Sequence, residues 1–166
     1  VGSEMCIRDS SKLYRFANVE QRKFLALYFK RYEVSVIKEC LNTVFDHRDV
    51  VLNLSIFDEF FNKHSQLDIN LLASSRTIEE LIANLKGTEY YAPLSQLADI
   101  ERPTLFDYEM TLDLYYFAQM WKDRSKVVTK RDLEELTAAW GSKFDMLNLQ
   151  WIYRSKRYYH MTLSLI

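Results

Sequence analysis

Residues 141–161, near the end of the chain, gather the side-chain types that hold nucleic acids. In "YRSKRYY", which starts at Tyr153, the cations Arg154, Lys156 and Arg157 would contact phosphates while tyrosine rings stack on bases. The same residues suit a helix end, where cations meet the negative end of the helix dipole and aromatic rings pack inward. The chain has 22 Lys and Arg against 23 Asp and Glu, so it lacks the basic excess of nucleic-acid binders. We therefore favour the helix-end interpretation.

A second candidate is "HRD" at His47–Asp49, followed by Asn53, which is close to the catalytic loop of protein kinases. In that loop four residues separate Asp from Asn, whereas three separate them here. The sequence also has no Gly-rich loop, no strand lysine and no Asp-Phe-Gly. Because phosphoryl transfer needs both metal-holding groups, the pattern argues against a kinase and favours a solvated loop between helices.

The histidines and cysteines do not form a recognisable site. His47, His64 and His160 never fall three or four residues apart, and no two acids accompany them at metal-ligand spacing. Cys6 and Cys40 form neither a metal motif nor a disulfide framework, and neither has the surroundings of a nucleophilic thiol. We expect no catalytic residue, no metal and no cofactor, and a reduced, cytoplasmic setting.

Two pairs of adjacent acids, Glu79 with Glu80 and Glu134 with Glu135, do not suggest acid–base catalysis either. Neighbouring residues of a helix point about 100° apart, so neither pair can act as a couple. Each pair falls in the expected first turn of a helix, where negative charge is favourable. Helix capping is the better explanation.

The elements that position these residues are predicted to be helices. The chain has only Gly 3 and Pro 2 with 48% hydrophobic residues, which favours long helices over a sheet with many tight turns. A hydroxyl residue is followed three residues later by an acid, the spacing of a capping box, at Ser55/Asp58, Thr77/Glu80, Thr104/Asp107 and Thr129/Asp132. No run of eighteen apolar residues exists, so no bilayer span is expected.

Apolar periodicity places the helices. The predicted ranges are 12–42 with a possible break near 31–33, 77–86 ending at Gly87, 104–122, 133–140 ending at Gly141, and 146–160 capped by Asp145. The helix over 104–122 is apolar around most of its girth, and Asp107, Asp113 and Lys122 form its wet edge. Residues 50–57 are expected to form a linker that runs into a helix.

A weak internal repeat accompanies these helices. "YEVSVIKECL" from Tyr32 and "FDMLNLQWIY" from Phe144 share an aromatic residue, an acid and an apolar-rich helix, at an offset of 112 residues. If the similarity is a true repeat, one unit spans about 110 residues.

Four stretches, in this order, resemble the C subunit (the d subunit in eukaryotes) of the V-type and A-type rotary ATPases, especially the bacterial V-type form. They are "KFLALYFKRYEVSVIKECL", the close of a first repeat; "LASSRTIEELIANLKGTEYYAPL", the start of a middle repeat with its Leu-x-Gly-Thr-x-Tyr turn; "TLFDYEMTLDLYYFAQMWK", its central helix; and "DMLNLQWIYRSKRYY", its closing helix. In the last stretch Asp145, Asn148, Arg154, Lys156 and Tyr159 stand in matching places. The likeness covers residues 12–161.

The resemblance implies an all-α helical repeat, a fragment of a funnel of three pseudo-repeats. Its expected parts are a foreign or disordered segment over 1–10, the close of the first repeat over 11–45, the middle repeat over 46–161, and the start of a truncated third repeat over 162–166. Such a subunit lies on the cytoplasmic face of the membrane as a peripheral component. It has no active site.

The implied partners are the central-stalk subunits and the membrane rotor ring, between which the protein transmits torque for H⁺ or Na⁺ transport. Neither a nucleic acid nor a small-molecule substrate is expected. Arg154, Lys156 and Arg157 are candidates for a partner interface. Two alternatives stay open: a free-standing helical adaptor with a groove for a partner peptide, and a helical nucleic-acid-binding module.

Overall fold

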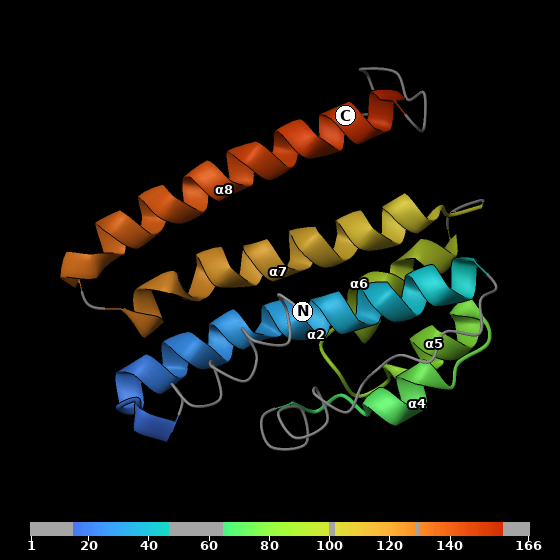
Figure 1. Cartoon of the computed structure of the whole chain (residues 1–166), viewed down its shortest axis with the longest axis horizontal. Coiled ribbons are helices and arrows are strands. Elements are labelled where there is room, and N and C mark those ends of the chain that lie inside the picture. Colours follow the sequence, from blue (N-terminus) through green and yellow to red (C-terminus); the bar gives the residue numbers. More distant parts are fainter. Residues whose placement is uncertain (1–14, 47–64, 100–101, 129, 158–166) are drawn as a thin grey trace. The chain divides into compact units, whose positions relative to one another are not determined.

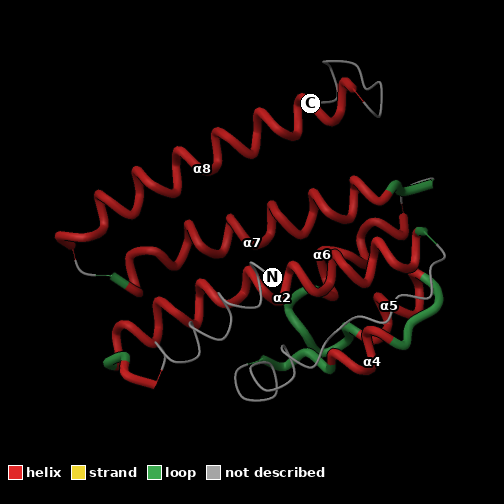
Figure 2. Tube along the Cα trace, in the orientation of Figure 1, coloured by secondary structure: helices red, strands yellow, loops and turns green. Residues whose placement is uncertain are grey.

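The computed structural model describes residues 15–46, 65–99, 102–128 and 130–157 (Figure 1). Within these ranges the chain forms α-helices and one short 3-10 helix without any strand, so the predicted all-α class is confirmed (Figure 2). Several predictions lie outside the described residues: the cap at Ser55 and Asp58, the loop at His47–Asp49 with Asn53, the linker over 50–57, and Thr129.

The elements follow one another as α2 (Val19–Phe45), α4 (Ile69–Ala73), α5 (Ile78–Asn84), α6 (Tyr91–Ser95), η1 (Gln96–Asp99), α7 (Leu105–Val127) and α8 (Lys130–Arg157). They divide into two compact units, residues 1–120 and 121–166. The first unit ends within α7, and the second contains the end of α7 and α8.

Helix α2 is continuous, so the possible break near 31–33 is wrong. Its start was not predicted: the Asn18 side chain accepts from the backbone N–H of Gln21 at 2.9 Å, and the Gln21 side chain accepts from the Asn18 N–H at 3.0 Å. This is a complete capping box without a hydroxyl or an acid. No Gly or Pro interrupts residues 31–33, and Tyr32 and Val34 are buried, so packing holds the helix through that region.

The caps of α5 and α7 are confirmed. The backbone N–H of Glu80 donates to Thr77 Oγ1 at 3.2 Å, which starts α5. At α7 the bonds are reciprocal: Asp107 N–H donates to Thr104 Oγ1 at 3.4 Å, and Thr104 N–H donates to Asp107 Oδ2 at 2.7 Å. Gly87, just beyond α5, has φ 89°, the left-handed conformation of a helix stop.

Helix α8 corrects the prediction of two helices, because it runs through Gly141 without a stop. A single glycine inside a helix costs only about 1 kcal/mol relative to alanine, which a helix of 28 residues can absorb. Asp145 is therefore an exposed residue within the helix and not an N-cap. Because α8 starts at Lys130, Glu134 and Glu135 lie beyond its first turn, whose acid is Asp132.

The core of the first unit lies between α2, the short helices and α7. In Figure 1, α4 and α5 lie beside α2, and residues of these helices contact one another. Side chains from all these elements are almost completely enclosed: Ile37, Leu41, Leu72, Leu81, Leu85, Leu94 and Leu112. Each such side chain contributes about 1.5–3 kcal/mol by leaving water.

Helix α7 is buried around less of its circumference than predicted. Its buried side is formed by Phe106, Tyr108, Leu112, Tyr116 and Met120, whereas Leu114 is 50% exposed. Asp113 does not belong to a wet edge, because its side chain is only 18% exposed and pairs with Lys38.

Candidate functional site

A carboxylate on α2 holds together segments that are far apart in the sequence. The hydroxyl of Tyr90 donates to Glu33 Oε2 at 2.5 Å, and the Ser65 hydroxyl donates to the other carboxylate oxygen. Tyr90 is 2% exposed, so its hydroxyl depends on Glu33 rather than on water. Both carboxylate oxygens thus bind hydroxyl donors from outside α2.

The turn that carries Tyr90 is built by its own sequence. Leu85 is completely buried and anchors the turn, and Gly87 supplies the left-handed residue. The Thr88 hydroxyl donates to the Leu85 carbonyl at 2.7 Å and accepts from the Tyr90 N–H at 3.3 Å. These bonds fix the turn, so Leu-x-Gly-Thr-x-Tyr is a local device that directs the tyrosine toward α2.

Charged and aromatic groups surround this network. Lys30, one helical turn before Glu33, pairs with Glu89 at 2.6 Å. The Tyr115 hydroxyl of α7 donates to Glu89 at 3.0 Å, and the Tyr115 ring meets the Tyr90 ring edge-on at 5.8 Å. We call Lys30, Glu33, Ser65, Glu89, Tyr90 and Tyr115 the Glu33 network. It connects α2, the 85–90 turn and α7.

Burial is the dominant electrostatic influence in the network. It raises the pKa of Glu33 above its ordinary value of 4.5, and the hydrogen bonds from Ser65 and Tyr90 oppose this effect. Burial also raises the pKa of Tyr90, with a further contribution from the Glu33 charge, and raises the pKa of Tyr115 to about 12. Both tyrosines therefore keep their protons and act as hydrogen-bond donors.

A cavity of about 340 Å³ adjoins the network and is lined by Lys30, Glu33, Gln66, Leu67, Thr88, Glu89 and Tyr90. The carboxylates that face it already accept hydrogen bonds from neighbouring side chains. The arrangement suits a structural brace, by which we mean that Glu33 connects α2 to neighbouring segments, better than a general base. A general base needs a carboxylate within hydrogen-bond reach of a substrate.

A second polar contact joins α2 to α7 farther along. Lys38 Nζ pairs with Asp113 Oδ1 at 2.5 Å, and both side chains are largely buried. One turn later, Asn42 Nδ2 donates to Glu109 Oε1 at 3.3 Å, and the Phe45 and Tyr108 rings lie 5.9 Å apart. The polar side of α2 therefore faces α7 through a series of specific partners.

The predicted interface cations lie where the sequence suggested, at the end of α8. Arg154, Lys156 and Arg157 are in its last turn; Arg154 is half-buried, and the other two are exposed. The expectation that the aromatic residues pack inward is wrong for Tyr153, which is 60% exposed. It holds better for Phe144, whose ring meets Trp121 at 5.6 Å.

The remaining candidates form no site in the described part of the chain. His47, His64, His160 and Cys6 lie outside it. Cys40 is buried, and burial with the nearby Glu39 charge raises its thiol pKa to about 12. No group of three metal-binding side chains occurs among the residues that the structure describes. Likewise, none of the helices described here combines the length and apolar character that crossing a bilayer requires.

Sequence reasoning missed Glu33 and Tyr90 as partners, although both stand in stretches that carry the family resemblance. The available signal was an acid placed between apolar residues of α2: Tyr32 and Val34, its neighbours, are both buried. A carboxylate in such surroundings requires hydrogen-bond donors. The sequence did not reveal which donors supply it.

Comparison with known proteins identifies the family of the chain. Residues 3–166 match the family described as ATP synthase (C/AC39) subunit. The chain belongs to this family. The matched range includes most of the segment 1–10 that was expected to be foreign or disordered, and the family is the one that the resemblance suggested.

A curated relative in the family is the C subunit of the A-type ATP synthase of Methanocaldococcus jannaschii, which is 24% identical over 147 residues. The aligned region is 87% of this chain and 36% of the relative, so the chain spans little more than a third of that protein. No solved structure matches the chain significantly.

Proposed function

We propose that this chain is part of a non-catalytic subunit that links the central stalk of a rotary ATPase to its membrane rotor ring. The subunit transmits torque between them and so couples ATP hydrolysis or synthesis to H⁺ or Na⁺ transport. Membership of the ATP synthase (C/AC39) subunit family supports this function over a free-standing adaptor or a nucleic-acid-binding module.

The proposal that the subunit transmits torque is supported by the series of polar contacts between α2 and its neighbours. Interdigitated apolar side chains resist the sliding of packed helices, and directional hydrogen bonds between named partners constrain their register further. Glu33 binds the 85–90 turn through Tyr90, and Lys38 binds α7 through Asp113. A subunit under torque benefits from such links, because close-packed, cross-linked helices deform little.

The proposed place of the subunit is the cytoplasmic side of the membrane, as a peripheral component that contacts the stalk and the ring. Its work requires neither a substrate nor a cofactor. Arg154, Lys156 and Arg157 are proposed to contribute to a partner interface, since two of them are exposed at the end of α8.

Omission of the subunit from the complete enzyme tests this function. We expect that a rotary ATPase assembled without it, with all other subunits present, binds its stalk weakly to the rotor ring, and that the full-length subunit restores the attachment. Co-purification of stalk subunits with affinity-tagged ring measures this. Equal attachment with and without the subunit would refute the proposal. Substitution of Arg154 and Arg157 by Glu in the full-length subunit then tests the proposed interface.

A further inference from the structure

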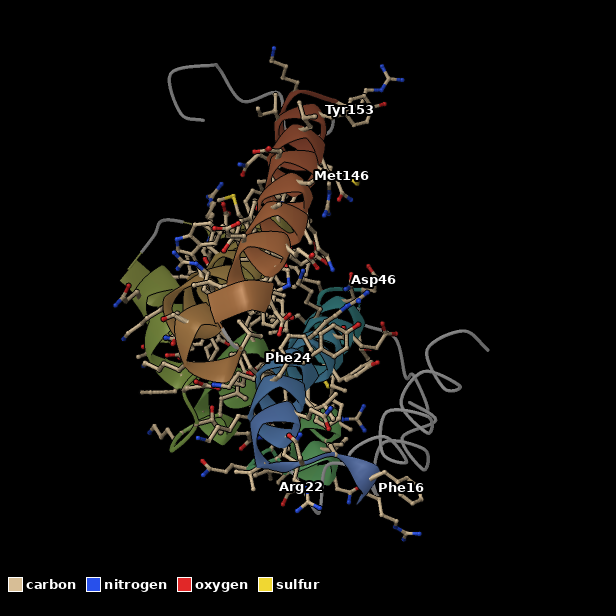
Figure 3. All side chains as sticks on the ribbon, turned by 90° about the vertical axis from the view of Figure 1, so that its left-hand side faces the viewer. Phe16, Arg22, Phe24, Asp46, Met146 and Tyr153 are labelled. Carbon is tan, nitrogen blue, oxygen red and sulfur yellow. The ribbon has the colours of Figure 1, made fainter. Side chains whose placement is uncertain are left out.

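The amino end of α2 carries apolar side chains that are not used in the core. Among the large apolar residues of the described chain, Phe16 and Val19 are the most exposed, at 85% and 71%. They flank Asn18, whose capping box with Gln21 fixes how the chain enters the helix. Figure 3 shows Phe16 pointing away from the ribbon at this end of α2. Two such side chains within four residues favour contact with an apolar medium outside the chain.

Positive charge is concentrated at the same end. Residues 12–23 contain four Lys and Arg against a single acid, although the whole chain is nearly neutral. Arg15, Arg22 and Lys23 are all exposed. Val19, Arg22 and Lys23 are separated by three and four residues, so they share one side of the first turns of α2. We call the following set the amino-terminal tip of α2: Arg15, Phe16, Val19, Arg22 and Lys23.

An anionic membrane surface offers both kinds of contact that the amino-terminal tip requires. Each Lys or Arg close to anionic lipid strengthens binding about fivefold, and aromatic rings are favoured at the level of the headgroups. A protein partner would have to supply a groove that fits a protruding helix end, because protein interfaces depend on complementary shape. A fluid headgroup layer adapts to such an end without a preformed groove. The combination of exposed ring and exposed cations therefore fits a lipid surface better than an acidic protein.

We propose that the amino-terminal tip of α2 binds the surface of anionic membranes. Phe16 and Val19 enter the headgroup region, while Arg15, Arg22 and Lys23 contact lipid phosphates. The helix does not cross the bilayer, and the contact adds to those with other subunits. This inference rests on the proposed peripheral position for its place in the cell, but binding to lipid alone requires neither the stalk nor the ring.

Sedimentation of the complete 166-residue chain with lipid vesicles tests the proposal. The chain is expected to bind vesicles made of equal parts phosphatidylcholine and phosphatidylglycerol at least about tenfold more tightly than vesicles of phosphatidylcholine alone. Phe16→Ser removes the ring and is expected to weaken binding to the mixed vesicles about tenfold. The matched control is Leu114→Ser, at an exposed apolar residue of α7, which should leave binding unchanged.

A charge reversal separates a defined tip from general attraction to negative charge. Lys23→Glu is expected to weaken binding at least about tenfold, whereas Lys122→Glu, at an exposed lysine of α7, should change it less than about twofold. Circular dichroism verifies that each variant retains its helices.

Three results would overturn the proposal. They are equal or absent binding to the two kinds of vesicle, equal effects of Lys23→Glu and Lys122→Glu, and a Phe16→Ser variant that binds like the wild type. The last result would indicate a purely ionic contact, as an acidic protein would make. Attachment of the stalk to the ring is measured without added vesicles, so failure of this proposal and failure of the proposed function are distinguishable.

Discussion

Removal of the Tyr90 hydroxyl probes the Glu33 network most sharply. Tyr90→Phe keeps the ring in its buried position but leaves Glu33 with one fewer donor. Because a hydrogen bond to a charged group contributes about 1.5–3 kcal/mol, the variant should lose roughly that much stability. In a double-mutant cycle with Glu33→Gln, which replaces the charged acceptor of this bond by a neutral amide, the two losses should overlap by about 1 kcal/mol, since both substitutions weaken the same contact. Guanidinium unfolding monitored by circular dichroism measures all four free energies.

The matched control is Tyr115→Phe, which removes the 3.0 Å hydrogen bond to Glu89. Glu89 is more exposed and can exchange this donor for water, so we expect a loss below about 1 kcal/mol. If Tyr90→Phe cost no more than Tyr115→Phe, or if the cycle with Glu33→Gln were additive, Glu33 would not be the brace described above.

Four further predictions follow from the same contacts. Because folding raises the pKa of Glu33, the native state binds the proton of this carboxyl more tightly than the unfolded state does. The stability of the wild type relative to Glu33→Gln should therefore fall as the pH rises from about 4.5. A stability difference that does not change with pH would contradict this. Lys38→Met leaves Asp113 without its largely buried cation and should cost about 1–2 kcal/mol in chemical unfolding, while the pair Lys38→Met with Asp113→Leu should recover much of it. Gly87→Ala should cost about 1–2 kcal/mol through its left-handed backbone alone, since a Cβ would meet no atom within 4 Å; an unchanged stability would argue against the turn. The Cys40 thiol, with a pKa of about 12, should resist thiol reagents at neutral pH until the chain unfolds, and rapid labelling of the native chain would contradict its burial.

The sequence predicted well those features of the fold that depend on neighbouring residues. Thr77 and Thr104 begin helices because their hydroxyls accept from backbone groups three residues away, and Gly87 ends one because its backbone is left-handed. Such effects are local and need no tertiary contact. Gly141 shows the limit of this reasoning, because one glycine costs a helix only about 1 kcal/mol and the 28-residue α8 continues through it.

The site could be predicted only in part, because its partners meet through tertiary packing. Glu33 and Tyr90 are 57 residues apart, and no local pattern pairs them. Asp113 was assigned to a wet edge because it is charged, yet Lys38 from α2 covers it. A charged residue in an apolar helix thus predicts a buried partner as readily as a solvent-facing side, and only the arrangement of helices decides between them.

The most direct test of the central claim is the number of ions transported for each ATP hydrolysed by the complete enzyme in sealed vesicles. With the full-length subunit present we predict a fixed ratio of ion uptake to hydrolysis. Without it, hydrolysis should continue while ion uptake is lost, and adding the subunit back should restore ion uptake and its fixed ratio to hydrolysis. Undiminished ion transport in its absence would contradict the account.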